Sequence, residues 1–574
     1  MPTETPKFDE LIDKILMELK PHSKICTECK FEFSVEIEDI AFLKMLRVPP
    51  PSLCPTCRSQ RRLSFANYSS IYKRKCNVPG HEDIMISPVA PVMPWVTYDH
   101  ETYYSDAWSP YSYGLNTSTE QSFFGQFLNL LKVVPQPGVR KGPDSINSDY
   151  GFYVQSVKDC YYVFGGKHLE NVMFSSAIYD SRNIIDSFLV RDVDTGYDNV
   201  SLNESFKCVN CYFSSNCIDS KFMYDCRNCS DCFGCVNLRN KKYCYFNEQY
   251  SKEEYFKKVN EIDLGSRKVY LDFKEKFFEF IKRNPVRAVR IQNSENVSGN
   301  DIKNSKNCHN VFGVKGGQNL RYANFIIVDL KDSMDVSHSG FGVNYYETQN
   351  VTSSSDVKFS FSCKEIVNGE YLITCTNCIN CFGCIGLKNA SYCIFNKQYS
   401  EEEYFEKLDE IKTKMLTNGE YGEFFPMSFS PVAYNSSFAN IVYPMNEEDA
   451  LSRSIFWQSE NNINTGNLKA IRASDLPDNI SDANKDLCDF AVIGKISEKP
   501  FRLTEREIDF YVRNKIALPI DTPQKRMLER FKLFNDFKVR KEYCDLCKKE
   551  TLSNYRKSDG YILYCDSCYK ANFS

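Results

Sequence analysis

The stretch CRNCSDCFGCVNLRNKKYCYFNEQYSKEEYF, residues 226–256, returns at residues 375–405 as CTNCINCFGCIGLKNASYCIFNKQYSEEEYF. Twenty of the 31 aligned residues are identical, so the two blocks mark an internal duplication. The similarity extends over residues 157–258 and 305–407. The centre of the chain therefore consists of two related halves.

Within each half, short phrases of Asn or Asp followed by apolar residues recur, mostly every ten to twelve residues, as in Asp159-Cys160-Tyr161 and Asn171-Val172-Met173. Short apolar strands punctuated by polar turn residues at a steady period are typical of stacked parallel strands. One turn cannot bury its inner face alone, so successive turns stack into a continuous core. The pattern predicts a mainly β fold with a central duplicated parallel β-solenoid, similar to a β-helix.

Each half is expected to end in a capping helix. Ser251 with Glu254 and Ser400 with Glu403 have the spacing of a capping box at a helix start. Apolar residues at helical spacing also predict an N-terminal helix over residues 6–20, and an amphipathic stretch over residues 269–282 connects the halves.

Cysteine is the unusual feature of the composition, with 26 residues, while the net charge is only −4. The first residues lack the apolar core of a secretory signal, and no apolar run approaches the ~20 residues that span a bilayer. These features predict a cytoplasmic protein without a membrane partner. Thiols stay reduced there, so metal ligation or core packing is expected before disulfides.

Paired CxxC knuckles stand near both ends. In the first set 24 residues separate the pairs, and in the second set 17 separate them. Two such knuckles place four thiolates around one tetrahedral Zn²⁺ and leave no open coordination position, which indicates a structural ion. The sequence predicts about two zinc ions, bound by Cys26, Cys29, Cys54 and Cys57 and by Cys544, Cys547, Cys565 and Cys568.

The two ends are copies of one module. An offset of 468 residues aligns them without a gap through the first ribbon and places Cys76 on Cys544. Each module is therefore a pair of ribbons. The N-terminal copy keeps the ligands of its first ribbon and only Cys76 of its second, with Pro79 and, roughly, Asp99 and Thr102 in the other ligand positions. The C-terminal copy keeps its second ribbon, and its first has Gly494, Ser497, Thr522 and Lys525 in the ligand positions. The degenerate ribbons are expected to hold together by packing alone.

These patterns divide the chain into eight parts. They are an N-terminal helix (1–24), the N-terminal ribbon module (25–110), a connector (111–150), solenoid half 1 with its capping helix (151–262), a helical linker (263–298), solenoid half 2 with its capping helix (299–411), a second connector (412–487) and the C-terminal ribbon module (488–574).

The central blocks also carry CxxCxxCxxC, which allows three interpretations. Cysteine packs as a small, readily buried apolar side chain, and stacked turns favour such residues at equivalent inward positions. A second class of zinc site and an iron–sulfur cluster are the alternatives, although the fourth spacing differs from that of ferredoxins. Packing is favoured. The candidate additional ligands are Cys226, Cys229, Cys232, Cys235, Cys375, Cys378, Cys381 and Cys384.

A basic run follows the first ribbon. Residues 58–75, RSQRRLSFANYSSIYKRK, contain six cationic side chains, no acid, and the aromatic residues Phe65, Tyr68 and Tyr72. Cations suit phosphates and aromatic rings suit unpaired bases, whereas a solvated basic face is the plain alternative. The candidate nucleic-acid-binding residues are Arg58, Arg61, Arg62, Lys73, Arg74 and Lys75.

Three phrases carry a family resemblance: CPTCRSQRRLSFAN (54–67), the FGC…QYS-x-EEYF blocks, and GEYGEFFPMSFSP (419–431). With them, nearly the whole chain resembles a family of large cysteine-rich proteins, known mainly from uncultured bacteria and described as hypothetical or zinc-binding. The resemblance implies zinc and no activity. Members often show a CPxCR knuckle near the C-terminal end, where this chain reads Thr522-Pro-Gln-Lys525-Arg.

The six histidines lack helix-spaced partners, and the chain contains no P-loop, dinucleotide fingerprint or nucleophile elbow. The sequence therefore favours a non-catalytic zinc protein that binds nucleic acid, such as RNA, or a nucleoprotein through its terminal modules. A protein-interaction scaffold that uses the solenoid surface is the alternative. A β-helix enzyme acting on carbohydrate is a third, less favoured hypothesis, because it would need clustered carboxylates that no motif reveals.

Overall fold

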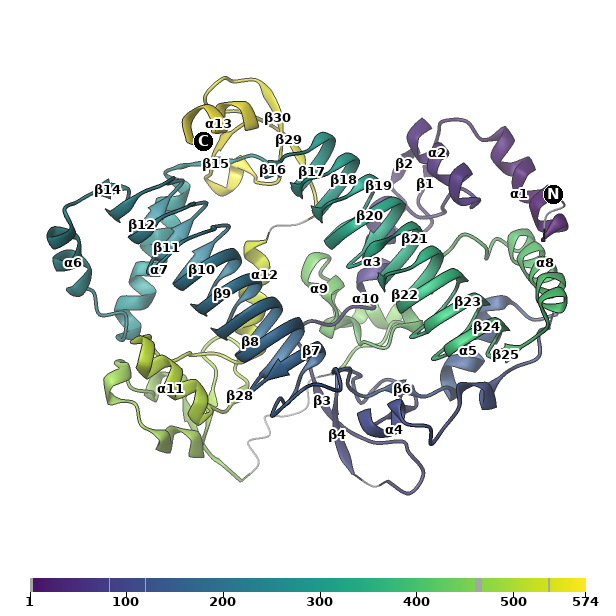
Figure 1. Cartoon of the computed structure of the whole chain (residues 1–574), viewed down its shortest axis with the longest axis horizontal. Coiled ribbons are helices and arrows are strands. Elements are labelled where there is room, and N and C mark those ends of the chain that lie inside the picture. The colour runs from purple at the N-terminus through teal and green to yellow at the C-terminus, as the bar shows by residue number, and fades with distance from the viewer. Residues whose placement is uncertain (1–3, 82, 119, 460–466, 535–536, 574) are drawn as a thin grey trace.

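The computed structural model describes residues 4–81, 83–118, 120–459, 467–534 and 537–573. The fold is mainly β and is dominated by two large parallel sheets, which lie beside each other (Figure 1). Sheet one contains β7 (Phe152–Lys158), β8 (Tyr161–Ile185), β9 (Phe188–Tyr197), β10 (Val200–Tyr212), β11 (Lys221–Tyr224), β12 (Ser230–Val236), β13 (Lys242–Tyr245) and β14 (Glu248–Gln249). Sheet two contains β16 (Ile291–Gln292), β17 (Glu295–Lys303), β18 (Lys306–Lys315), β19 (Gln318–Arg321), β20 (Asn324–Ser337), β21 (Gly340–Thr352), β22 (Ser355–Glu370), β23 (Thr376–Phe382), β24 (Lys388–Ile394) and β25 (Lys397–Gln398).

Strands in both sheets pair with the segment about twelve residues further on. Val200 pairs with Phe188, and Thr376 pairs with Lys388. The last pairing of each sheet, β13 with β14 and β24 with β25, is antiparallel.

A three-residue unit explains this register. Along residues 180–198 every third residue has a positive φ, and Asn or Asp occupies most of these positions. Asn and Asp tolerate this left-handed conformation better than other side chains. Every third residue also points inward, which gives each sheet an apolar interior of its own. Four such units fill the twelve-residue register.

This unit accounts for the CxxCxxCxxC motif. Cys226, Cys229, Cys232 and Cys235 occupy successive inward positions, and each is at most 1% exposed. Cys244 lies beside Cys232 in the next strand. The second motif is buried in the same way within sheet two. Inside this interior, Sγ donates to backbone carbonyls two and nine residues away, as Cys226 does to Tyr224 and Cys235 at 3.5 and 3.4 Å.

Both predicted capping boxes are present, at the starts of α6 (Lys252–Asn260) and α8 (Glu401–Thr417). These helices lie at opposite far ends of the two sheets (Figure 1). Helix α1 (Pro6–Glu18) lies where the sequence predicts a helix and packs on α8, and α7 (Arg267–Lys282) matches the predicted amphipathic stretch.

The terminal modules consist of short hairpins and helices. The N-terminal one contains β1 (His22–Ile25), β2 (Glu32–Val35), α2 (Ile37–Leu46), α3 (Pro55–Leu63), β3 (Tyr72–Lys75), β4 (Ile84–Ser87), β5 (Thr97–Tyr98) and α4 (His100–Tyr104). The C-terminal one contains β26 (Lys469–Arg472), β27 (Phe490–Ile493), β28 (Pro500–Phe501), α11 (Glu505–Asn514), α12 (Pro523–Leu533), β29 (Arg540–Tyr543), β30 (Glu550–Ser553), β31 (Ile562–Tyr564) and α13 (Asp566–Phe573).

The connecting segments carry the remaining elements, which are α5 (Phe123–Val133), β6 (Gln136–Pro137), β15 (Pro285–Arg287), α9 (Phe438–Val442), α10 (Glu447–Ser452) and short 3-10 turns at 110–113, 427–429, 434–436, 473–475, 480–482, 485–489 and 557–559. Residues 460–466 of the predicted second connector lie outside the described residues.

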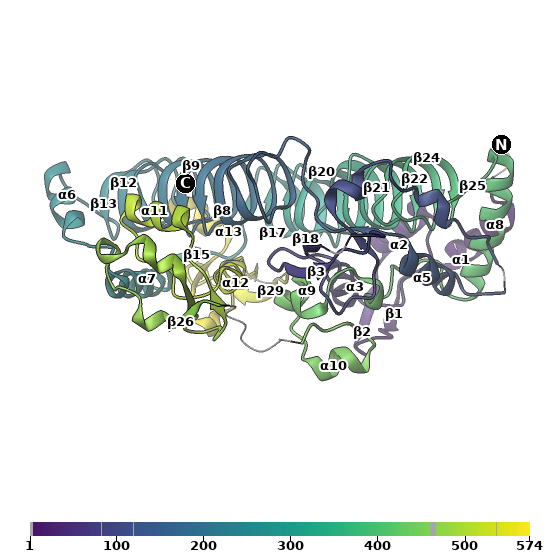
Figure 2. The ribbon, with the colours of Figure 1, turned by 90° about the horizontal axis from the view of Figure 1, so that it is seen from below.

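Each module touches both halves of the chain. Helix α3 packs on β20 and β21 of sheet two, whereas Tyr162 of sheet one donates its hydroxyl to the carbonyl of Ser69 in the same module at 2.9 Å. Conversely, α12 packs on β8 and β9 of sheet one, and Asn300 of sheet two donates to Oδ1 of Asn554 in the C-terminal module at 2.9 Å. The strands form one layer, and the modules and α9 lie on one side of it (Figure 2). The modules therefore cross-brace the two sheets from the same side.

Candidate metal centres and buried charge networks

Two four-cysteine clusters form where the sequence predicts them. In each, the four Sγ atoms lie within 4.8 Å of one another. Cys29 and Cys54 are 3.8 Å apart, as are Cys547 and Cys565. A metal ion with Zn–S bonds of ~2.3 Å in tetrahedral geometry requires a similar sulfur–sulfur separation of about 3.8 Å. Each cluster can therefore hold one metal ion.

The chain supplies the same backbone frame to both clusters. A left-handed residue closes each knuckle, Lys30 in the first and Lys548 in the second. The first cysteine of each cluster accepts an N–H at 3.3 Å, Cys26 from Cys54 and Cys544 from Cys565. Although burial acts to raise it, backbone N–H groups lower the pKa of Cys544 to about 6. At Cys544 the frame thus favours thiolate, the form that binds metal, whereas burial and the neighbouring thiols raise the pKa of Cys565.

A third group of donor atoms lies in the N-terminal module. Cys76, His81 and Asp99 bring one sulfur, one nitrogen and one oxygen within 4.8 Å of one another, and Cys76 is 3% exposed. The sequence predicted a degenerate ribbon here, with Cys76 and, roughly, Asp99 at its ligand positions, and missed His81, because the knuckle reads Cys-x4-His. Among the described residues, the central cysteines do not form a group of this kind.

The degenerate ribbon of the C-terminal module is held by a carboxylate as well as by packing. Buried Asp521 accepts the N–H groups of Ile496 and Ser497 at 2.7 and 3.1 Å. Gly494 keeps the knuckle bond to the carbonyl of Lys499 at 2.9 Å. The expectation of packing alone was therefore incomplete.

The prediction that Arg58, Arg61 and Arg62 bind nucleic acid is wrong, because all three are buried. Their exposed fractions are 1%, 8% and 0%. Nε of Arg58 lies 2.8 Å from Asp335, and Nη1 of Arg62 lies 2.9 Å from Glu347. These carboxylates belong to β20 and β21, so the arginines fasten α3 to sheet two.

The rest of the basic run divides into buried and exposed residues. Arg74 donates to the carbonyl of Trp95 at 3.1 Å and faces the module interior, while Lys73 and Lys75 are exposed. Phe65 and Tyr68, proposed as stacking rings, are 1% and 4% exposed and belong to the apolar cores. Only the two lysines of the run therefore remain available to a phosphate.

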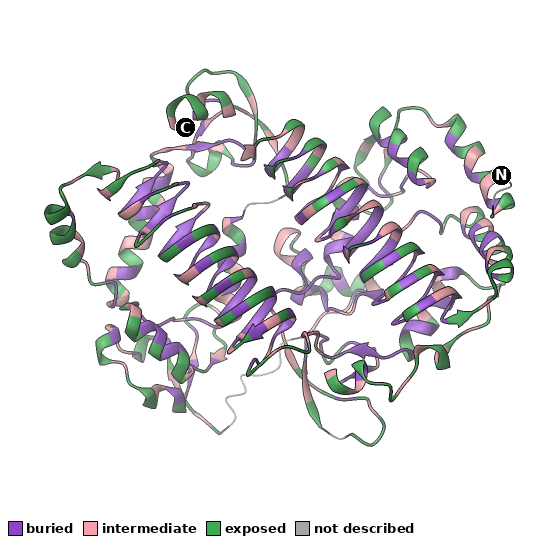
Figure 3. Ribbon diagram, viewed as in Figure 1, coloured by how far each residue is buried: buried purple, intermediate pink, exposed green. Residues whose placement is uncertain are grey.

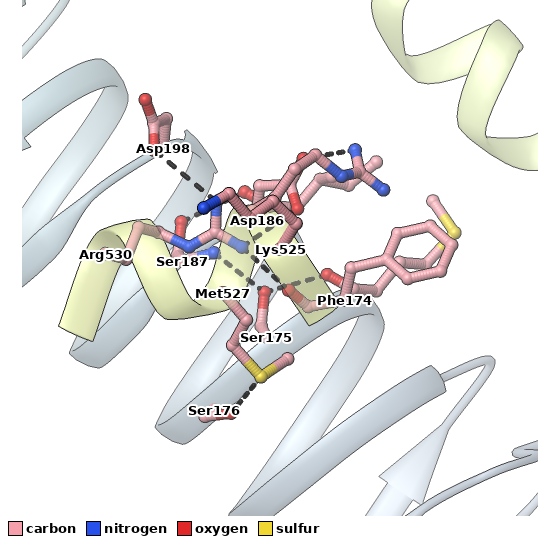
Figure 4. A network of polar contacts seen from close by, with 12 residues as sticks. Phe174, Ser175, Ser176, Asp186, Ser187, Asp198, Lys525, Met527 and Arg530 are labelled. Carbon is pink, nitrogen blue, oxygen red and sulfur yellow. Dashed lines mark hydrogen bonds and ion pairs between the residues drawn. The ribbon is translucent and has the colours of Figure 1, made fainter. Parts of the chain in front are cut away.

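A second network repeats the first at the other end of the chain. Arg526 and Arg530 lie 2.6 and 3.0 Å from Asp186 in sheet one, and Arg530 reaches Asp198 at 3.5 Å (Figure 4). The module offset of 468 places Arg526 on Arg58 and Arg530 on Arg62. The offset of 149 between the two central blocks places Asp186 on Asp335 and Asp198 on Glu347. The duplication of the module and the duplication of the central half thus keep the same arginine–carboxylate contacts between a module helix and a sheet.

Glu507 on α11 completes the second network and is sensitive to pH. Its carboxylate lies 3.1 Å from Arg526, and burial raises its pKa to about 7 against the effect of that cation. Because this pKa exceeds the ordinary 4.5, the folded chain binds the proton more tightly than the unfolded chain between those values. The stability that Glu507 contributes is full below about pH 4.5 and declines as the pH rises to about 7.

We therefore expect the free energy of unfolding of the wild type, relative to Glu507→Gln, to fall by on the order of 2 kcal/mol from pH 5.5 to pH 7.5. Hydrogen exchange of α11 in both proteins, corrected for the intrinsic exchange rate at each pH, measures it locally, because so large a chain need not unfold in one step. Glu505→Gln on the exposed side of α11 is the control and should show no such change. A wild-type-to-Gln difference that is independent of pH would contradict the prediction.

In the described residues, no helix combines the length and the apolar character needed to cross a bilayer. Comparison with models of known protein families and with curated proteins gave no match.

Proposed function

We propose that this chain is a non-catalytic, zinc-stabilised scaffold, which presents the uncovered flank of its two sheets to a protein partner. The observation that carries the proposal is that the arginine side chains of both modules point into the molecule, toward the sheets. The arginines that would have formed a nucleic-acid surface are instead paired with Asp335, Glu347, Asp186 and Asp198 inside the molecule.

We infer that the metal in both four-cysteine clusters is zinc, with about two structural ions per chain. Four thiolates in a tetrahedral arrangement suit zinc and leave no position for a substrate. We also infer that each sheet is a β-solenoid whose turn comprises four three-residue units. The register of twelve residues and the left-handed residue at every third position support this inference.

The uncovered flank differs from an ordinary solvated face. Exposed residues follow the strands of both sheets on the face seen in Figure 3, and Arg506 of α11 borders this face of sheet one near Glu170 and Arg182. Phe206 and Ile218 are neighbours on adjacent turns of sheet one and are 37% and 48% exposed. Val367 and Ile379 are neighbours in sheet two and are 40% and 47% exposed. The offset of 149 places Ile218 on Val367, so each half carries one apolar pair.

Ion pairs continue the same column of sheet one beyond its apolar pair. Lys158 lies 3.1 Å from Glu170, and Arg182 lies 2.7 Å from Asp194. Apolar contact with a polar rim is the composition of protein–protein interfaces, and large exposed apolar residues in a regular row suit such contact. The partner we propose is therefore a protein with apolar side chains at a similar spacing.

Nucleic acid remains a second candidate because of one cavity between the C-terminal module, sheet one, α7 and α9. It has a volume of about 460 Å³, and its lining combines cations with aromatic rings: Lys282, Lys532, Arg540, Arg556, Phe534, Phe537, Tyr555 and Tyr561. Such a lining suits phosphates and bases. Lys73 and Lys75 would add exposed positive charge in the other module.

One experiment separates the two candidates. Tagged full-length chain is used to capture partners from an extract of the native host, with and without nuclease, and each captured protein is purified and tested for direct binding. We expect nuclease-resistant binding that Phe206→Glu with Ile218→Glu weakens at least tenfold, while Glu505→Gln, an exposed change on α11 outside this column, leaves it unchanged.

Two results would overturn the scaffold. Direct binding that is equal for all variants would exclude the apolar flank. Binding to labelled single-stranded RNA that falls with salt and is lost in Lys532→Glu with Arg556→Glu, without any flank-dependent protein partner, would favour the second candidate.

A further inference from the structure

The cluster of Cys76, His81 and Asp99 has the geometry of a metal site. Sγ of Cys76 and Nδ1 of His81 lie 3.5 and 3.4 Å from Oδ2 of Asp99. Thr102 fixes this carboxylate by donating its N–H to Oδ1 at 2.9 Å and its hydroxyl to Oδ2 at 2.8 Å. A ligand carboxylate oriented by neighbouring donors in this way is typical of metal centres.

The backbone around the cluster is that of the four-cysteine site in the other module. Cys76 donates its N–H to Asp83 at 3.1 Å, as Cys544 does to Lys549 at 2.9 Å. The N–H of Asn77 bonds to Thr97 at 2.9 Å, as that of Asp545 bonds to Leu563 at 2.7 Å. A knuckle hairpin, a short strand and a helix start therefore supply the donors at both places.

The turn between the first two donors is also shared. Gly80 has a φ of +82°, and Lys548, on which the module offset places it, has a φ of +61°. This left-handed residue lets the chain fold back after the first cysteine. In the N-terminal module the next donor is displaced from the position of Cys547, where Pro79 stands, to His81. One thiolate has thus been kept, and an imidazole and a carboxylate take the place of the other sulfurs.

We propose that Cys76, His81 and Asp99 bind a third zinc ion whose fourth ligand is exchangeable. Sulfur, imidazole nitrogen and carboxylate oxygen are all zinc donors, and three protein ligands leave one tetrahedral position to water or to a small anion or thiol. His81 and Asp99 have side chains that are 48% and 28% exposed, so solvent reaches the site. The two four-cysteine clusters are coordinatively closed, and this site is open.

Metal stoichiometry tests the proposal independently of any partner. Full-length protein is loaded with zinc, dialysed against metal-free buffer and analysed by elemental mass spectrometry. We expect about three ions for the wild type and about two for His81→Ala and Asp99→Asn. His168→Ala is the matched control, because His168 forms an exposed pair with Asp180 at 2.8 Å, outside the modules, and should keep three.

The open position has its own readout. With cobalt in place of zinc, added azide should change the visible absorption of the wild type and of His168→Ala, and should not change that of His81→Ala. Near-ultraviolet circular dichroism identifies any variant that has lost its fold. If His81→Ala is such a variant, the metal content of the isosteric Asp99→Asn tests the site instead. Two zinc ions in the wild type, or three in both site variants, would overturn the third site. Neither result would alter the capture experiment for the scaffold.

Discussion

Asp186→Ala is expected to destabilise the docking of α12 on sheet one by about 3–5 kcal/mol, because it leaves two guanidinium groups buried without their shared carboxylate. The Asp186 side chain is 1% exposed and contacts both Arg526 and Arg530. Glu507 remains near Arg526, but Arg530 keeps a single carboxylate, Asp198 at 3.5 Å, beside the neutral carbonyl of Phe174 at 3.4 Å. Without its partner, a buried cation still lacks hydration, and no opposite charge offsets that unfavourable free energy.

Asp335→Ala should have a smaller effect of the same kind at the other end of the chain, since Asp335 contacts Arg58 and Arg62 but Arg62 keeps Glu347 at 2.9 Å. The two networks occupy different sheets, so the effects of the two substitutions should be additive. Hydrogen exchange followed by mass spectrometry measures each one locally, in α12 or in α3, and avoids assuming that so large a chain unfolds in one step.

Glu170→Ala is the control for both substitutions. It removes a partner of Lys158, but the side chains of this pair are 51% and 56% exposed. Exposed pairs contribute about 0–1 kcal/mol, because water solvates each charge separately. If Asp186→Ala were no more damaging than Glu170→Ala, the buried pairs would not be what holds the module on the sheet.

The sequence predicted the duplication, both four-cysteine clusters and the helix caps, because each depends on residues close together in the chain. Four cysteines in two CxxC pairs need only a hairpin and a helix start to converge. Ser251 and Glu254 lie within one turn, so their capping box follows from spacing alone.

The role of the basic run could not be predicted in this way. Arg58 and Asp335 are 277 residues apart, and a window that contains only one partner resembles a phosphate-binding surface. A signal was nevertheless present in the two duplications. The arginines recur at the module offset, and acids recur at the offset between the halves, at Asp186 with Asp335 and at Asp198 with Glu347. Arginines kept in both modules and carboxylates kept in both sheets indicate that each module contacts a sheet through these charges.

The third donor group was missed for a related reason. A fixed CxxC spacing finds only ligands that keep their places, whereas His81 lies two residues beyond the position of Cys547 in the aligned module. Asp99 converges with it through β5 and the start of α4, and spacing alone placed it only roughly.

Removal of metal from the first cluster is expected to release α3 but to leave α12 docked. Cys54 precedes α3 and Cys57 lies in its first turn, next to Arg58. The metal therefore fixes the end of the helix that carries all three buried arginines. Metal binding contributes on the order of 10 kcal/mol to the folding of isolated zinc fingers, so its loss should unfold the β1–β2 hairpin and loosen the arginine network behind it.

Helix α12 has no metal at its start. Asp521 and the cap of Thr522 hold that ribbon, and Thr522 accepts the N–H of Lys525 at 3.2 Å. The second cluster instead joins β29, β30 and α13, where the Tyr569 hydroxyl donates to Oδ1 of Asn237 at 2.7 Å. The two modules therefore use metal at different places, and their helices should respond differently to its loss.

Cys54→Ser tests this asymmetry, with Cys565→Ser as the matched control. We expect hydrogen exchange in α3 to become more than about tenfold faster in Cys54→Ser, a local loss of at least about 1.4 kcal/mol, while exchange in α12 and in both sheets stays unchanged. Cys565→Ser should accelerate exchange in β29 to β31 and in α13 and leave α3 protected.

Each sheet has an apolar interior of its own, so neither substitution should unfold it. Equal acceleration of exchange in α3 and α12 in Cys54→Ser would contradict the prediction that metal holds the start of α3 while Asp521 holds the start of α12. Collapse of both sheets would show that the modules are needed for the core as well as for bracing.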